Sequence, residues 1–140
     1  MNLSPHFTVE ELTATQHRHL ANDPPLDILA NLKRTAMLLE QVRTRLGVPV
    51  IVSSGYRSAA VNAAVGGQRN SQHLTGCAAD FIAPQFGGAV TVASTLRDCR
   101  DVDYDQLILE FGRWVHISWA DKPRRQAFII DETGTRPMWD

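Results

Sequence analysis

Helical patterns dominate the first part of this 140-residue chain, and strand patterns cluster late. The strongest helical pattern follows the break at Asp23-Pro24-Pro25, where apolar residues recur at three- and four-residue steps up to Gly47. The members of this apolar stripe are Leu29, Leu32, Ala36, Leu39, Val42 and Leu46. We expect the stripe to form the main core helix.

Shorter helices are predicted from local signals. Thr8 and Glu11 are spaced as a capping box, and Phe7 and Leu12 are placed as a hydrophobic staple, so a short helix is expected to begin after Thr8. Two further helices are predicted over Ser58–Val65 and about Ala89–Cys99.

Five segments have strand-like patterns: Val48–Ser53, Cys77–Ala83, Gln106–Phe111, Trp114–Trp119 and Gln126–Asp131. Gly112 and Arg113 leave a hairpin-length connection between two of them. Helices followed by a cluster of strands favour an α+β fold, with a mostly antiparallel sheet and helices packed on it. No repeat or linker divides the chain, so we expect one domain over 1–140, with 130–140 as a loosely held tail.

Composition and charge exclude several classes of protein. The chain is 44% hydrophobic and 21% charged, which is typical of a globular domain. Its 14 basic and 15 acidic side chains give a net charge of -1, so we expect no nucleic-acid partner. The first thirty residues contain neither a secretion signal nor a membrane anchor, which predicts a protein that is cytoplasmic as synthesised. Cys77 and Cys99 leave both a single disulfide and two free thiols open.

Three ionisable residues lie in apolar or glycine-bounded segments: His73, Asp80 and His116. Such a group needs a partner when it is buried, because transfer of an unpaired ionisable group from water is costly. Two imidazoles and one carboxylate form a three-ligand set that leaves a fourth zinc position open, as in catalytic rather than structural sites. A hydrogen-bonded core role for each residue separately is the alternative. Trp114 shares the strand face of His116, so it is a candidate to line the cleft.

Motifs around these residues occur in a characteristic order. They are SGYRS at 54–58, N-x-x-V-G-G from Asn62, SQHLTGCAAD at 71–80 and WVHIS at 114–118. The set resembles the zinc D-alanyl-D-alanine metallopeptidase family, which includes DD-carboxypeptidases, vancomycin-resistance dipeptidases and phage endolysins and shares its fold with the hedgehog signalling domain. The opening SPHFTVEEL is similar to the family's small single-domain branch. The resemblance covers about residues 3–119 and implies a hedgehog/DD-peptidase-like fold.

The resemblance also implies roles for individual residues. His73, Asp80 and His116 correspond to the ligands of Zn²⁺. Arg57 corresponds to the arginine that binds substrate and stabilises negative charge on the scissile carbonyl, and Ser71 to a serine that hydrogen-bonds the substrate backbone. The alternatives are a structural ion pair for Arg57 and an ordinary turn serine at position 71.

The general base is the point where this sequence departs from many relatives. They carry a glutamate three residues before the last histidine ligand, where this chain has Arg113. The small single-domain members place their acid at the position of Glu110, which is therefore the predicted catalytic base. A solvated charge at the end of a strand, or a partner of Arg113, is the alternative for Glu110.

The leading functional hypothesis is a zinc peptidase that cuts peptidoglycan stem or cross-link peptides. It would act as a monomeric DD-carboxypeptidase or endopeptidase, such as a phage or prophage lysis enzyme that reaches the cell wall by release or delivery. A non-catalytic module, zinc-stabilised and either wall-binding or structural in a phage particle, is the alternative because of Arg113. A cytoplasmic D-Ala-D-Ala dipeptidase is a third hypothesis.

Overall fold

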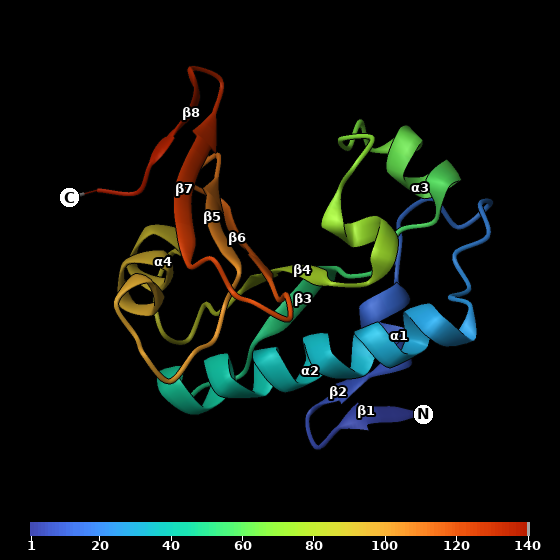
Figure 1. Ribbon diagram of the computed structural model, residues 1–140, viewed down its shortest axis with the longest axis horizontal. Helices are drawn as coiled ribbons and strands as arrows, with labels where there is room; N and C mark the ends of the chain where they lie inside the picture. The colour runs from blue at the N-terminus through green and yellow to red at the C-terminus, as the bar shows by residue number, and fades with distance from the viewer. Residues whose placement is uncertain (140) are drawn as a thin grey trace.

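A six-stranded sheet organises the computed structural model, which describes residues 1–139 (Figure 1). Its strands, in chain order, are β3 (Ile51–Ser54), β4 (Ala78–Ile82), β5 (Gln106–Glu110), β6 (Trp114–Ser118), β7 (Gln126–Asp131) and β8 (Gly134–Pro137). The helices are α1 (Val9–Thr13), α2 (Leu26–Leu46), α3 (Ala59–Ala64), the 3₁₀-helix η1 (Gln72–Thr75) and α4 (Ala89–Arg97). A small hairpin, β1 (Asn2–Ser4) with β2 (Phe7–Thr8), precedes α1. The α+β class is therefore confirmed.

The sheet is mixed, where the sequence predicted a mostly antiparallel one. Its order is β3-β4-β6-β5-β7-β8, and β5 and β7 are parallel whereas the other neighbours are antiparallel. The parallel pair arises because β6 ends beside the start of β5, at the pair Leu107 and Ile117. A short connection then carries the chain across that end of β5, and β7 runs alongside β5 in the same direction.

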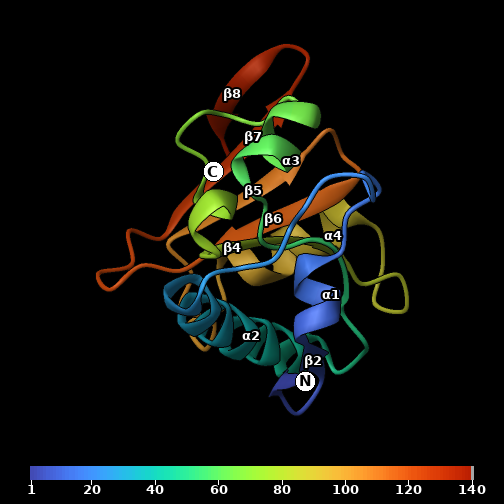
Figure 2. The ribbon, with the colours of Figure 1, turned by 90° about the vertical axis from the view of Figure 1, so that its right-hand side faces the viewer.

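Side chains alternate between two chemically different faces of the central strands. On one face, apolar residues of β4, β5 and β6 join the hydrophobic core with the apolar stripe of α2 and with α4. These strand residues are Ala79, Phe81, Leu107, Leu109, Val115 and Ile117. The opposite face carries Asp80 and His116, and α3 and η1 lie on that side of the sheet, away from α4 (Figures 1 and 2).

The predicted local signals are present in the helices. Thr8 and Glu11 form the capping box of α1, and Phe7 and Leu12 are both buried. The long helix α2 begins directly after Pro25 and ends at Gly47, whose φ of 70° is the left-handed conformation that favours glycine at a helix C-terminus. Within the described residues 1–139, no helix has the length and apolar character needed to cross a membrane.

Three local features differ from expectation or resolve an alternative. The expected loose tail contains β8, which pairs with β7, and Met138 beyond it is buried, because the turn after β7 folds the chain back against this strand.

The β5–β6 turn centres on Phe111 and Gly112 rather than on Gly112 and Arg113. Both central residues have positive φ, 54° and 64°, as a type I′ turn requires. Cys77 and Cys99 are free thiols.

Candidate metal centre

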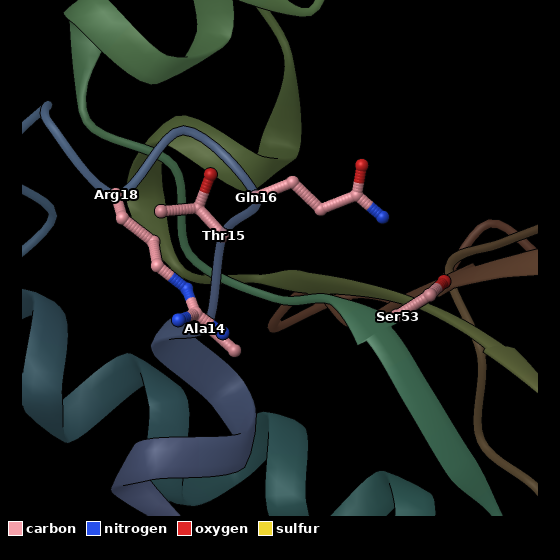
Figure 3. Close-up of a pocket in the computed structure, with 5 residues that line it drawn as sticks. All are labelled: Ala14, Thr15, Gln16, Arg18 and Ser53. Atoms are coloured by element: carbon pink, nitrogen blue, oxygen red, sulfur yellow. The ribbon is translucent and has the colours of Figure 1, made fainter.

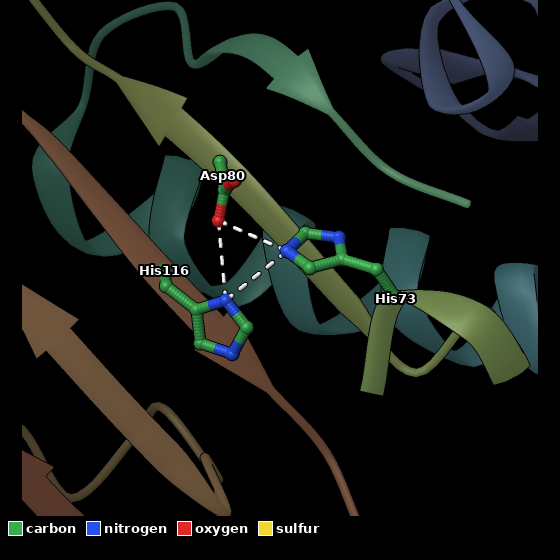
Figure 4. Close-up of side chains that lie close together, drawn as sticks. All are labelled: His73, Asp80 and His116. Atoms are coloured by element: carbon green, nitrogen blue, oxygen red, sulfur yellow. Dashed lines mark hydrogen bonds and ion pairs between the residues drawn. The ribbon is translucent and has the colours of Figure 1, made fainter. Parts of the chain in front are cut away.

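Three separate elements bring the predicted metal ligands together (Figure 4). Asp80 and His116 are direct cross-strand partners on β4 and β6, so the sheet register itself sets their separation. His73 comes from η1, which lies over this face of the sheet. All three side chains are buried, with 3 to 7% of each residue exposed.

The ligand atoms converge to hydrogen-bonding distances. Asp80 Oδ1 lies 3.2 Å from His73 Nε2 and 3.1 Å from His116 Nδ1, and the two ring nitrogens are 3.2 Å apart. Within the described part of the chain, these are the histidine, cysteine and acidic residues grouped closely enough to hold a metal ion together.

A backbone contact fixes the protonation of His73. Its Nδ1 donates to the carbonyl oxygen of Gly55 at 2.7 Å, and because a carbonyl only accepts, the proton of the neutral ring resides on Nδ1. Nε2 therefore presents a lone pair toward Asp80 and His116. Outer partners of this kind set the tautomer and orientation of metal-binding histidines.

The donor set fits a cation better than a proton. His73 Nε2 and the carboxylate Oδ1 of Asp80 both offer lone pairs, and both face His116 Nδ1. A single proton on His116 Nδ1 cannot serve both acceptors fully, whereas a metal ion accepts lone pairs from all three atoms at once. Two imidazoles and one carboxylate are a donor set that suits Zn²⁺ and leaves a position free.

Electrostatics keep these groups in the protonation states that a cation needs. Burial lowers the pKa of His73, which favours the neutral ring. Burial opposes ionisation of Asp80, but any proton that His73 or His116 carries on the nitrogen facing Asp80 stabilises the carboxylate, and this effect outweighs burial and holds the pKa of Asp80 well below its usual range. The carboxylate and the neutral imidazole are the forms that ligate metal.

Arg57 contacts the cluster through Asp80. Its Nη2 donates to Asp80 Oδ2 at 3.2 Å, its Nε to Ser54 Oγ at 3.1 Å and its Nη1 to Asn62 Oδ1 at 3.2 Å. These bonds use three of the five N–H groups of a guanidinium. One N–H on each terminal nitrogen is left for another acceptor, so the structural ion pair and the predicted substrate contact are compatible.

Glu110 lies at the edge of the cluster, at the end of β5. Its Oε1 is 3.9 Å from His116 Nδ1, and its Oε2 accepts a hydrogen bond from Trp114 Nε1 at 3.1 Å. Burial raises the pKa of Glu110, and the negative charge of Asp80 raises it further. Arg113, which occupies the position where many relatives carry a glutamate, lies in the exposed turn. In this chain, Glu110 places a carboxylate beside the cluster.

Ser71 has a structural contact of its own. It is the N-cap of η1, and its Oγ accepts a hydrogen bond from the backbone N–H of His73 at 3.1 Å. The hydroxyl therefore helps to orient a predicted ligand. Its contact with a substrate backbone stays a prediction.

The sequence assigned no role to several residues that support the site. Asn62 is buried, and besides accepting from Arg57 it donates to the carbonyl of Gln68 at 2.8 Å. Ser54 and the carbonyl of Gly55 hold Arg57 and His73. The sequence signal that could have identified them is their position in two motifs: SGYRS, which contains Arg57, and N-x-x-V-G-G, which follows it.

A separate hollow of about 400 Å³ opens beside β3 (Figure 3). It is lined by Ala14, Thr15, Gln16, Arg18 and Ser53. Ser53 connects it to the site only indirectly, because its Oγ donates to the backbone carbonyl of Asp80 at 3.3 Å.

Comparison with protein families bears directly on the cluster. Residues 5–118 match the family described as Peptidase M15, a span that contains every predicted ligand and Glu110. The chain belongs to the peptidase M15 family. This is the zinc D-Ala-D-Ala peptidase family that the motifs resemble. Membership assigns this M15 chain to the metallopeptidases, and its His-Asp-His cluster is a group that could hold the metal. Comparison with curated proteins gave no match.

Proposed function

We propose that this M15 chain is a zinc peptidase that hydrolyses peptide bonds in the stem or cross-link peptides of peptidoglycan. The observation that carries the proposal is the convergence of His73 Nε2, Asp80 Oδ1 and His116 Nδ1, with a carboxylate 3.9 Å from His116. DD-carboxypeptidase, endopeptidase and endolysin-type lytic activities share this chemistry and differ in which bond is cut. The proposed fold is of the hedgehog/DD-peptidase type, as the motifs suggest.

His73, Asp80 and His116 would hold the zinc ion. A zinc ion in such a site lowers the pKa of water toward neutrality and polarises a carbonyl oxygen. The Gly55 carbonyl keeps His73 in place, because it binds Nδ1, the ring nitrogen that faces away from the other ligands. Arg57 does the same for Asp80, because it binds Oδ2 and leaves Oδ1 to the cluster.

Glu110 supplies the proton transfer that hydrolysis of an amide requires. Its Oε2 is held by Trp114, which leaves Oε1 on the side of the cluster to take a proton from the attacking water. The same oxygen then delivers the proton to the nitrogen of the leaving amine. Its burial makes protonation easier than for an ordinary glutamate, which suits the second half of this cycle.

Arg57 supplies positive charge near the scissile carbonyl. Hydrogen bonds to Ser54, Asn62 and Asp80 fix the guanidinium before substrate arrives. A fixed charge stabilises the developing oxyanion more than the neutral amide, which lowers the barrier. We propose that the enzyme acts as a monomer.

Purified protein, metal-depleted and then titrated with Zn²⁺, should bind one ion and release new amine ends from isolated sacculi. Mass spectrometry of the fragments identifies the bond that is cut. His73→Ala should lose both zinc binding and cleavage. His19→Ala, which changes an exposed histidine outside the cluster, is the matched control and should retain both.

The outcomes separate the competing hypotheses. Zinc binding without cleavage of sacculi would overturn the proposed activity and favour the non-catalytic, zinc-stabilised module. Cleavage that persists in His73→Ala would show that the cluster is not the active centre. Cleavage of free D-Ala-D-Ala alone, with intact sacculi, would favour the dipeptidase.

A further inference from the structure

A buried asparagine lies outside the metal cluster, in the segment 14–25 that connects α1 to α2. Asn22 is 8% exposed, whereas its neighbours Ala21 and Asp23 are both exposed. The segment forms neither helix nor strand, and it passes the start of α3 (Figures 1 and 2). Burial of a polar side chain is costly unless hydrogen bonds satisfy it, so the partners of Asn22 indicate what it holds in place.

The amide of Asn22 bonds to three backbone groups. Its Nδ2 donates to the carbonyls of Thr13 at 2.8 Å and Tyr56 at 3.0 Å, and its Oδ1 accepts from the N–H of Ser58 at 2.7 Å. Carbonyls only accept and a backbone N–H only donates, so the contacts themselves set the orientation of the amide. Neither aspartate nor leucine, which have a similar size, could make all three contacts.

Two of these contacts hold the backbone on both sides of Arg57. Tyr56 precedes Arg57 in the chain and Ser58 follows it, so one side chain binds both flanking residues. The N–H of Arg57 itself donates to the carbonyl of His73 at 3.0 Å. The backbone from which the arginine side chain extends is therefore fixed at three successive residues.

The position of this backbone decides where the guanidinium lies. An arginine side chain has several rotatable bonds, and holding it in one arrangement costs conformational entropy. Its bonds to Ser54, Asn62 and Asp80 are 3.1 to 3.2 Å long, so a small displacement of the backbone would break them. A misplacement of about 1 Å in an active site can lower a rate by about 100-fold.

We propose that Asn22 is a positioning residue, which fixes the backbone around Arg57 and thereby the guanidinium that stabilises the developing oxyanion. The inference rests on the proposed function, because it explains how Arg57 is held for the role given to it there. All three contacts of Asn22 are with backbone groups, so it acts on the reaction through Arg57.

A double-mutant cycle tests this role. Asn22→Ala should lower the rate at which the zinc-loaded protein releases amine ends from sacculi by about 10- to 100-fold, with one zinc ion still bound. In the Arg57→Lys background, the same substitution should lower the rate by less than about 2-fold, because the guanidinium that it positions is already absent. Asn22→Asp, which keeps the size and the acceptor for Ser58, is a second variant and should show the same pattern.

Ser4→Ala is the matched control. Ser4 is also 8% exposed, and its Oγ donates to Glu40 Oε2 at 2.6 Å, but it lies on β1, away from α3 and η1 (Figure 1). Loss of this hydrogen bond should leave the rate within about 2-fold of the parent's. Equal fold-losses from Asn22→Ala with and without Arg57→Lys would overturn the positioning role while the peptidase stands.

Hydrogen exchange followed by NMR tests the same contacts without an activity assay. In the parent protein, the Nδ2 protons of Asn22 and the N–H of Ser58 should exchange about 100-fold more slowly than the Nδ2 protons of the exposed Asn2. Asn22→Ala should speed exchange of the Arg57 Nε proton about 10-fold, and Ser4→Ala should not. Fast exchange at Asn22 in the parent would overturn the inference. If the parent releases no amine ends from sacculi, the proposed function fails, and the catalytic role of Asn22 fails with it even where its exchange is slow.

Discussion

Glu110 illustrates how a single side chain acquires a function from its surroundings. It is held by Trp114 and stands 3.9 Å from His116. We expect Glu110→Gln to lower kcat by about 10²- to 10⁴-fold, because glutamine keeps the size and the hydrogen bond but cannot accept the proton. Steady-state kinetics on sacculi, with zinc content measured in parallel, checks this. Normal turnover in the variant would exclude Glu110 as the base.

Arg57 is a second residue whose geometry carries a prediction. Its planar guanidinium reaches Ser54, Asn62 and Asp80 at once, which a lysine ammonium cannot reproduce. Arg57→Lys should lower kcat by about 10²-fold with zinc still bound. Arg113→Lys in the exposed turn makes the same exchange away from the cluster, and its kinetics should match the parent's.

At the scale of elements, Gly55 lies where three elements meet. It directly follows β3, packs against Leu12 of α1 and contacts His73 of η1. A side chain there would collide with the backbone carbonyl of Leu12, and the carbonyl of Gly55 itself orients His73. We expect Gly55→Ala to lower the free energy of unfolding by about 1 to 3 kcal/mol and to weaken zinc binding. Urea denaturation and zinc titration measure the two effects.

The control for this change is Gly88→Ala at the start of α4, where an added methyl group meets no atom within 4 Å. Its effect on stability should stay below about 1 kcal/mol. Equal destabilisation by the two substitutions would contradict the assigned role of Gly55.

At the scale of the whole molecule, Asp105 links segments that are distant in sequence. Its buried carboxylate accepts hydrogen bonds from Arg124, before β7, and from Gln72 in η1. These contacts, led by Arg124, lower the pKa of Asp105 to about 2. A lowered carboxyl pKa stabilises the fold fully above the unfolded value of 3.8, and the contribution is lost as the pH falls from about 4 to 2.

We therefore expect about 2 kcal/mol of stability to disappear over this acid range. Asp105→Asn should be less stable at neutral pH and should lose less on acidification, as measured by urea unfolding at a series of pH values. Asp98→Asn changes an exposed carboxylate and should follow the parent's pH profile. An unchanged profile for Asp105→Asn would refute the linkage.

Local patterns predicted most elements because their causes are local. The capping box of Thr8 and Glu11 and the apolar stripe of α2 act within a few helical turns. Strand pairing across the sheet escaped prediction, since the parallel partner of β5 depends on where the chain crosses after β6. The β1–β2 hairpin and β8 were also missed, because strands of two to four residues leave too short a pattern to recognise.

The sequence by itself determined the fold class, the family and the identity of the candidate ligands, because motif order and periodicity are written in the chain. Only the tertiary structure decided what those residues do together. It set the tautomer of His73 through the carbonyl of Gly55, and it placed Oε1 of Glu110 at 3.9 Å from His116 Nδ1. The reason is physical: His73 and His116 are 43 residues apart, and folding alone brings their ring nitrogens within 3.2 Å.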